Sequence, residues 1–214
     1  MAGESYAGRY LPLIACQILR DNEASRHPER GLQPLPLTLV LIGNGITSPK
    51  AQYPAYVEFA CDDSHGYGKF LTEEQCKSMR EDIPTCLALV NKCNAVEGPS
   101  DDYDVLACKL ASDYCEAKLS DPWFLTGRSA YDWRHWGDYE EEAWVAAFLN
   151  DRHKKSALGV EKLMGDKHDG VFVGCSDAVY KHFVMSGDGS RDSMWAVRDI
   201  LSKGTRVLAY FGTA

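Results

Sequence analysis

The sequence predicts an α/β fold in which a partial parallel sheet carries a large helical, disulfide-bearing insertion. Residues 1–19 have the pattern of a short strand, a tight turn and a helix. Residues 35–42 and 206–211 are apolar runs typical of buried parallel strands. The long segment between these two runs is rich in helical patterns, aromatic residues and cysteines. Strands that are separated by helical segments favour a parallel sheet.

The first element is a tight turn around Ser5. Gly3 lies two residues before Ser5, and Ala7 and Gly8 follow it. A serine acts as a nucleophile when a sharp strand-to-helix turn exposes its hydroxyl close to backbone N–H groups. Small residues on both sides permit such a turn, so the pattern indicates a nucleophile at Ser5. A glycine-rich turn before an ordinary helix would contain the same small residues.

A helix is predicted after this turn by an apolar stripe at helical spacing. The stripe consists of Tyr10, Leu11, Leu13, Ile14, Ile18 and Leu19. Pro12 is compatible with this helix only if it lies in the first turn, since proline lacks a backbone N–H. Cys16 lies on the stripe and is expected to be a small buried hydrophobic residue.

The strand at residues 35–42 ends at the loop Gly43-Asn44-Gly45, and ligands of α/β sheets bind at such carboxyl ends. A helix from Met194 through Leu201 then leads into the last strand. We therefore expect a core at residues 1–48, a helical insertion or lid at residues 49–182, and a return to the core at residues 183–214. Within the insertion, residues 140–150 have the spacing of a core helix, and the tryptophans at 123, 133, 136 and 144 are expected to pack.

The cysteine spacing predicts two nested disulfides. Cys86 and Cys93 are seven residues apart, as are Cys108 and Cys115, so each pair lies on one face of a helix. If the two helices form an antiparallel hairpin, Cys93 meets Cys108 and Cys86 meets Cys115. No close Cys-x-x-Cys pair is present, so we expect no zinc site, and no other metal or cofactor is indicated.

The composition excludes several classes of function. The net charge of −8 and the pI near 5.2 disfavour binding to nucleic acids and to anionic membranes. No apolar stretch is long enough to cross a bilayer. Eight cysteines favour an oxidising compartment, although no secretory signal is present, which suggests that the natural N-terminus lies upstream.

Three colinear motifs give the chain a resemblance to a known family. They are Glu4-Ser5-Tyr6-Ala7-Gly8-Arg9-Tyr10, Leu41-Ile42-Gly43-Asn44-Gly45-Ile46-Thr47, and Thr126-Gly127-Arg128 with Tyr131-Asp132. Over nearly its whole length the chain resembles serine carboxypeptidases of the yeast carboxypeptidase Y type. The resemblance implies an α/β-hydrolase fold with a helical insertion over the active site. It also implies the removal of single residues from the C-terminus of peptides in a vacuolar or secretory compartment.

The resemblance implies roles for particular residues. Ser5 matches the acyl-forming nucleophile, and the backbone N–H of Tyr6 matches one donor of the oxyanion hole. Glu4 matches a glutamate that the family keeps protonated to bind the terminal carboxylate of the substrate. Ile46, Tyr53 and Tyr56 match the pocket for the penultimate side chain; taken alone, two tyrosines three apart are typical of packing on a helix face.

The family pattern implies further features outside this pocket. It predicts the two nested disulfides and a third between Cys61 and Cys76. The family bridges the position of Cys175 to a cysteine that lies before the nucleophile and is absent here. The family's pocket tryptophan follows a Gly-Asp pair, whereas Gly189 follows Gly187-Asp188 here, so substrate preference cannot be transferred.

The acid and histidine of a hydrolase triad follow the serine in the chain. By the resemblance the acid would be the residue after Ala214, and the six histidines of this chain lie in linker, insertion or polar positions. We therefore expect a carboxypeptidase whose 214 residues are inactive alone and, with an incomplete sheet, poorly soluble. The alternatives are a non-catalytic pseudoenzyme or peptide-binding module, and an acyltransferase on the same scaffold.

Overall fold

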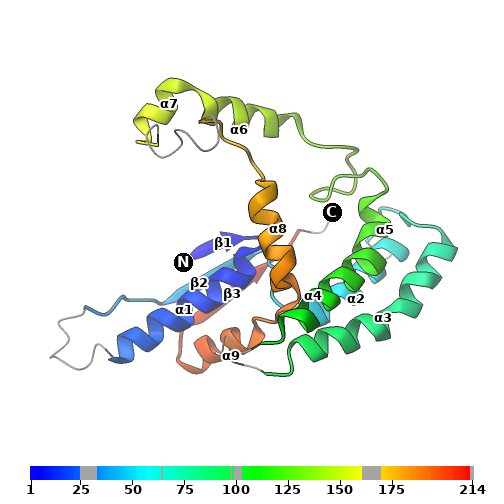
Figure 1. Ribbon diagram of the computed structural model, residues 1–214, viewed down its shortest axis with the longest axis horizontal. Coiled ribbons are helices and arrows are strands. Elements are labelled where there is room, and N and C mark those ends of the chain that lie inside the picture. Colours follow the sequence, from blue (N-terminus) through cyan, green and yellow to red (C-terminus); the bar gives the residue numbers. More distant parts are fainter. Residues whose placement is uncertain (25–32, 64, 97, 99–102, 161–169, 213–214) are drawn as a thin grey trace.

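The computed structural model describes residues 1–24, 33–63, 65–96, 98, 103–160 and 170–212. It contains a small parallel sheet with helices beside it and a second, helical region away from the sheet (Figure 1). None of the helices in these ranges is long and apolar enough to span a membrane. The α/β class predicted from the sequence is confirmed by this arrangement.

The secondary-structure elements follow one another along the chain as strand, helix, strand, a long helical series and a final strand. In order they are β1 (Ala2–Glu4), α1 (Ala7–Ala24), β2 (Leu39–Gly43), α2 (Pro49–Cys61), α3 (Glu73–Cys93), α4 (Val105–Cys115), a π-helical turn (Glu116–Ser120), α5 (Asp121–Phe124), α6 (Glu140–Asn150), α7 (Arg152–Ala157), α8 (Asp177–Ser186), a 3-10 turn (Asp188–Ser190), α9 (Met194–Ser202) and β3 (Arg206–Tyr210).

The sheet has the order β1-β2-β3, with both pairs of strands parallel. The register pairs Gly3 with Ile42, and Ile42 with Ala209. Parallel strands need long crossovers between them, and α1 supplies the first of these. The second crossover contains the whole helical insertion and α9. All three strands therefore present their carboxyl ends at one edge, where the Ser5 turn and the Gly43-Asn44-Gly45 loop lie.

Helices α1 and α9 cover one face of this sheet. Their shared core consists of Leu11, Ala15, Cys16, Val40, Ile42, Ala196 and Ile200. Cys16 is 1% exposed, as expected of a small buried hydrophobic residue. The predicted stripe on α1 was wrong in part, because Tyr10 and Ile14 are 43% and 47% exposed. The buried face of α1 is instead built largely from smaller residues, which let the helix approach the sheet closely.

The structure also corrects the expected position of Pro12. This residue is the sixth of α1 and so lies beyond its first turn. Proline has no N–H to donate to the carbonyl four residues earlier, which here belongs to Gly8. The hydroxyl of Ser193 donates to the Gly8 carbonyl at 3.0 Å and replaces the missing helical hydrogen bond. A residue just before α9 thus stabilises the first part of α1.

The other face of the sheet is less covered than the sequence predicts. Leu208 and Tyr210 of β3 are 50% and 51% exposed, so the expectation of a buried last strand was wrong. Within the described ranges, β1 and β3 each have a neighbouring strand on one side only. Exposed apolar strands at a sheet edge favour aggregation. The poor solubility of these 214 residues alone therefore stays a prediction.

The insertion has its own hydrophobic core, formed by α2, α3, α4 and α5. Buried members include Val57, Met79, Val90, Leu119 and Trp123. The N-terminus of α3 is stabilised by a capping box, in which Thr72 and Gln75 satisfy each other's backbone N–H groups. The expected boundaries of the core and insertion at residues 48 and 182 stay predictions.

Three disulfides stabilise this helical region. They join Cys61 to Cys76, Cys86 to Cys115, and Cys93 to Cys108, the same pairings that the sequence predicts. The last two fasten α3 to α4 as an antiparallel hairpin. Cys16 and Cys175 form no disulfide within the described residues, and Cys175 is exposed.

Removing a disulfide is expected to destabilise the protein substantially. Cys93 and Cys108 are 15 residues apart. Closing a loop of ~15 residues in the unfolded chain stabilises the folded state by about 3 kcal/mol. Chemical denaturation of the full-length Cys93→Ala/Cys108→Ala variant should show a loss of this size in oxidising buffer. In a reductant that opens all the bridges, wild type and variant should unfold together. Equal stability in oxidising buffer would contradict the expectation.

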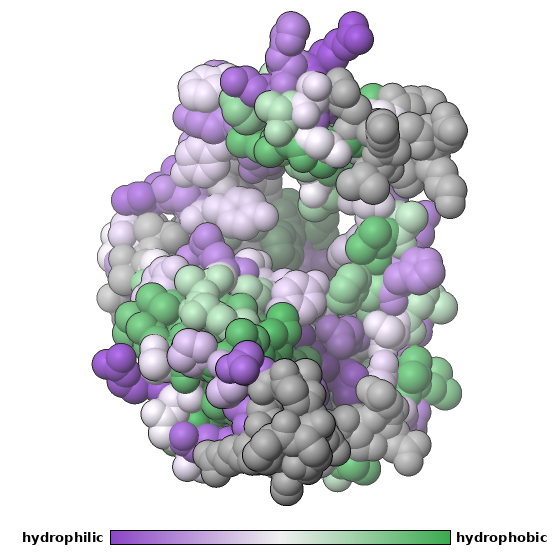
Figure 2. Space-filling model, turned by 90° about the vertical axis from the view of Figure 1, so that its left-hand side faces the viewer, coloured by the Kyte–Doolittle hydropathy of each residue, from purple (hydrophilic) through white to green (hydrophobic). Residues whose placement is uncertain are grey.

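Helices α6 and α7 form an arm that stands apart from the rest of the molecule (Figure 1). Neither helix contains a buried residue, so the expectation of a core helix at residues 140–150 was wrong. Trp144 is 63% exposed and Trp136 62% exposed, whereas Trp123 and Trp133 are buried. Figure 2 shows the arm above a gap, with apolar side chains gathered on the arm.

Candidate active site

The turn that carries Ser5 has a strained but well-fixed backbone. Ser5 has a φ of 58°, a conformation that residues other than glycine rarely adopt. Its N–H donates to the carbonyl of Gly43 at 2.9 Å. Its own carbonyl accepts from the N–H groups of Gly8 and Ile46, both at 3.0 Å. These hydrogen bonds hold the strained residue in place, and Ser5 is exposed at the tip of the turn.

Two glycines allow the turn and the neighbouring loop to approach closely. A Cβ atom on Gly8 would lie 2.6 Å from the backbone nitrogen of Ile46. A Cβ atom on Gly45 would lie 2.2 Å from the Cγ2 of Ile42. Both distances are too short for a real contact, so only glycine fits at these positions. Gly8 and Gly45 are therefore needed for the close packing of the Ser5 turn against the loop after β2, and a glycine-rich turn alone would not require this packing.

The turn leaves a backbone donor available beside Ser5. The N–H of Tyr6 has no acceptor among the described residues, while the Tyr6 carbonyl accepts from Arg9 at 2.9 Å. This N–H precedes α1, where free N–H groups and the helix dipole favour negative charge. The arrangement of an exposed serine hydroxyl followed by a free N–H suits the stabilisation of an oxyanion.

Glu4 lies next to Asn44 at the edge of the sheet. The side-chain amide of Asn44 donates to Glu4 Oε1 at 3.2 Å. The backbone N–H of Asn44 donates to the Tyr210 carbonyl at 2.8 Å, and its Oδ1 accepts from the N–H of Gly212 at 2.9 Å. Asn44 thus joins the ends of all three strands. Sequence reasoning noted this loop as a ligand-binding position but gave Asn44 no role.

The residues expected to form the side-chain pocket lie in the loop after β2 and on α2, and their role in binding the substrate stays a prediction. Ile46 lies beside Ser5 and is half-buried. Tyr53 is buried, and its hydroxyl donates to Glu116 at 2.8 Å inside the insertion. The Tyr56 ring lies 5.8 Å from that of Trp123. Burial, followed by the nearby Glu116, raises the pKa of both tyrosines. These two side chains belong to the core of the insertion.

Asp188 is a second residue whose position sequence reasoning missed. The Tyr6 hydroxyl donates to Asp188 Oδ2 at 2.6 Å, and the Arg9 guanidinium lies 3.2 Å from Asp188 Oδ1. Burial and this hydrogen bond raise the pKa of Tyr6 far above its ordinary value. The Gly187-Asp188 pair was visible in the sequence, but nothing local indicates that it reaches a turn about 180 residues earlier.

The family comparison agrees with this geometry. The serine carboxypeptidase family matches residues 1–214, which is the whole chain. The chain belongs to the serine carboxypeptidase family. The resemblance inferred from the sequence motifs is thereby confirmed.

Several curated serine carboxypeptidases are similar to this chain. Carboxypeptidase Y homolog A of Paracoccidioides brasiliensis is 34% identical, with 100% of this chain and 36% of the relative covered. Carboxypeptidase Y of Candida albicans is 34% identical, and that of Saccharomyces cerevisiae is 33% identical; each match covers 99% of this chain and 36% of the relative. The chain therefore spans 36% of the length of the relatives compared.

A solved structure of this enzyme class has the same fold. It is Kex1(delta)p, a prohormone-processing carboxypeptidase from Saccharomyces cerevisiae, with a TM-score of 0.63. The two sequences are 21% identical, and the match covers 99% of this chain and 43% of the other. The predicted α/β-hydrolase fold is confirmed by this likeness.

In this serine carboxypeptidase chain, two of the described histidines make contacts within the insertion. His65 hydrogen-bonds the Phe59 carbonyl at 2.9 Å, and His135 stacks on Tyr139. His27 and His168 lie outside the described residues. Within the described ranges, no group of three or more His, Cys, Asp or Glu side chains could hold a metal ion.

Proposed function

We propose that the protein is a serine-type carboxypeptidase and that Ser5 forms its acyl-enzyme. The observation that carries this proposal is the strained, exposed Ser5 with the free Tyr6 N–H beside it. Proteins keep such strain where surrounding contacts enforce it, and a nucleophile held on a sharp turn is a known reason for it. Membership of the serine carboxypeptidase family supports the same assignment.

The reaction proceeds in two steps. The Ser5 Oγ bonds to the carbonyl carbon of the last peptide bond, and the carbonyl oxygen becomes an oxyanion beside the Tyr6 N–H. The C–N bond then breaks, and the serine proton reaches the leaving nitrogen through a general base. Water then adds its hydroxyl to the acyl carbon, the bond between this carbon and Ser5 Oγ breaks, and the proton of the water reaches Ser5 Oγ through the general base. The products are the terminal amino acid and the shortened peptide.

We propose that the general base lies outside the described residues. Triad members act as a unit, and their loss reduces catalysis by several orders of magnitude. Because the described histidines form no hydrogen bond with Ser5, we expect these 214 residues alone to be inactive. The activity proposed here is that of the longer protein.

Glu4 is proposed to bind the terminal carboxylate of the substrate. It lies one residue from Ser5, is exposed, and is oriented by Asn44. A glutamic acid donates a hydrogen bond to a carboxylate only in its protonated form, whereas the Asn44 amide can donate in every form. The pair would therefore recognise a free C-terminus.

Replacing Glu4 should weaken the preference for a free C-terminus. A hydrogen bond to a charged group contributes about 1.5–3 kcal/mol, so Glu4→Ala should lower kcat/KM for a free peptide about tenfold to a hundredfold. Glu4→Gln, whose amide still donates, should lose less. The same peptide with an amidated C-terminus is the matched control, because it lacks the carboxylate. Equal losses on both peptides would contradict this role.

For the substrate and the compartment, we propose a class and not a particular peptide or organelle. The family implies a peptide substrate, and nothing in the described residues favours a nucleic-acid or membrane partner. Three disulfides suit an oxidising compartment, so we propose a vacuolar or secreted location.

The test is release of the C-terminal residue from blocked dipeptides by the full-length protein. The proposal expects this release and its loss after treatment with a serine-directed phosphonate. A pure, folded protein that leaves the dipeptides intact but transfers acyl groups from activated esters would favour an acyltransferase instead. A protein that neither cleaves peptides nor reacts with the phosphonate would be a pseudoenzyme or a peptide-binding module.

A further inference from the structure

The segment of residues 187–193 connects the disulfide-bonded hairpin to the nucleophile turn. It follows α8 and contains the 3-10 turn that carries Asp188. A Cβ atom on Gly187 would lie 2.4 Å from the Cys108 carbonyl carbon, so the segment packs directly on the α4 backbone. Asn94 donates to the carbonyl of Ser190 at 2.8 Å, and Ser190 is completely buried. One end of the segment is thus fixed to the hairpin.

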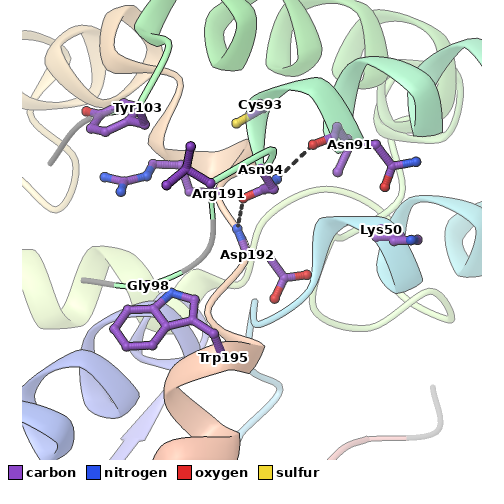
Figure 3. A pocket seen from close by; sticks show the side chains of 11 residues that line it. Lys50, Asn91, Cys93, Asn94, Gly98, Tyr103, Arg191, Asp192 and Trp195 are labelled. Carbon is purple, nitrogen blue, oxygen red and sulfur yellow. Dashed lines mark hydrogen bonds between the residues drawn. The ribbon is translucent and has the colours of Figure 1, made fainter. Parts of the chain in front are cut away.

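The other end of the segment bonds to the two backbone stretches beside Ser5, which are the start of α1 and the loop after β2. The hydroxyl of Ser193 donates toward the carbonyls of Gly8 at 3.0 Å and Thr47 at 2.9 Å. Ser48 donates to Asp192 at 2.7 Å. Figure 3 shows Asn94 beside Asp192, whose N–H donates to the Asn94 Oδ1 at 2.8 Å. The segment therefore links α3, the start of α1 and the loop after β2.

Asp188 contacts Tyr6, the residue that follows Ser5 in the chain. It accepts the Tyr6 hydroxyl at 2.6 Å and forms an ion pair with Arg9 at 3.2 Å. The Arg9 residue is 6% exposed, and its Nε has no hydrogen-bond partner. Removal of one member of a buried ion pair leaves the other charge uncompensated, so Arg9 depends on Asp188 to stay in place.

The Tyr6 side chain depends on the same carboxylate. Its ring contacts those of Tyr10 and Phe183, with centroids 5.2 Å and 5.5 Å away. These two ring contacts do not prevent the Tyr6 ring from sliding along its long axis. The hydrogen bond from the Tyr6 hydroxyl to Asp188 does prevent this movement. Tyr6 follows Ser5 directly and supplies the free N–H beside it. A shift of the Tyr6 ring would therefore move this N–H relative to the serine hydroxyl.

We propose that Asp188 is a positioning residue, which sets the Tyr6 N–H against the Ser5 oxyanion by holding Tyr6 and Arg9 together. The proposal rests on the proposed function, since it assigns Asp188 a purpose in that reaction. Asp188 touches neither the substrate nor the reacting atoms. Its effect is expected in kcat more than in KM, because the oxyanion exists in the transition state and not in the bound substrate.

The test compares kcat and KM of full-length variants on a blocked dipeptide. Asp188→Asn keeps a hydrogen-bond acceptor but removes the charge that balances Arg9. A small displacement of catalytic groups reduces rates by up to about a hundredfold, so kcat should fall about tenfold to a hundredfold while KM changes less than about twofold. Asp188→Glu should recover part of the loss. Asp113→Asn, an equivalent change in an exposed pair with Lys109, is the matched control.

A second variant keeps the proposal testable if Asp188→Asn does not fold. Tyr6→Phe leaves the ion pair with Arg9 and removes only the hydroxyl bond, and it should also lower kcat. In the double variant Tyr6→Phe/Asp188→Asn the losses should be less than additive, because both changes break the same contact.

Active-site titration with the phosphonate gives the fraction of competent enzyme, to which each kcat is normalised. A normalised kcat of wild-type size in Asp188→Asn and in Tyr6→Phe would overturn the positioning role while leaving the proposed function intact. An inactive, unlabelled wild type would overturn the proposed function, and the positioning role with it.

Discussion

Replacement of Ser5 by alanine is expected to abolish peptide hydrolysis by the full-length protein. The nucleophile of a serine hydrolase contributes about a million-fold to kcat, because the remaining triad members cannot act without it. The exposed Ser5 and the free Tyr6 N–H support the proposal that Ser5 is this nucleophile. Steady-state hydrolysis of a blocked dipeptide measures the loss, and Ser78→Ala on the exposed face of α3 is the matched control.

A second variant at this position tests the strain itself. Ser5→Gly also removes the hydroxyl, but glycine adopts a φ of 58° without a steric penalty. Relief of such strain should raise the free energy of unfolding by about 1 kcal/mol. We therefore expect an inactive protein that is more stable than wild type in chemical denaturation. Full activity in either variant would exclude Ser5 as the nucleophile.

Gly8→Ala is expected to impair both folding and catalysis. The new methyl group would lie 2.6 Å from the Ile46 nitrogen and 2.7 Å from its carbonyl oxygen. Backbone atoms cannot rotate away, so α1 and the loop after β2 must separate. Overpacking of this kind destabilises by about 1–3 kcal/mol. Because the Ile46 N–H also bonds the Ser5 carbonyl, we expect kcat to fall on the order of a hundredfold.

The matched control for Gly8→Ala is Gly174→Ala. At Gly174 a Cβ atom would meet no other atom within 4 Å, and the φ does not require glycine. This variant should keep wild-type stability and kcat. Equal behaviour of the two variants would contradict the close approach at Gly8.

Local spacing predicted much of the fold. The turn around Ser5 and the paired cysteines of α3 and α4 are short patterns, and short patterns determine local geometry. The helix at residues 140–150 was also predicted, but its lack of any buried residue was not. Periodicity describes which residues share a face, and it cannot say whether another element covers that face.

Contacts between distant segments could not be predicted. Asn44 joins three strand ends through bonds to residues far away in the chain. Asp188 meets Tyr6 only because the insertion brings α8 back to α1. The hydrogen bond from Tyr53 to Glu116 likewise joins two distant positions of the insertion. Each side chain could be recognised as polar or aromatic in the sequence, but its partner could not.

The most direct test of the central claim is the site at which a serine-directed phosphonate attaches to the full-length protein. Peptide mapping by mass spectrometry should place one adduct on Ser5, and the loss of carboxypeptidase activity should be proportional to the labelled fraction. An adduct on a different serine, with Ser5 unmodified in the inactivated protein, would contradict the assignment of Ser5 as the nucleophile.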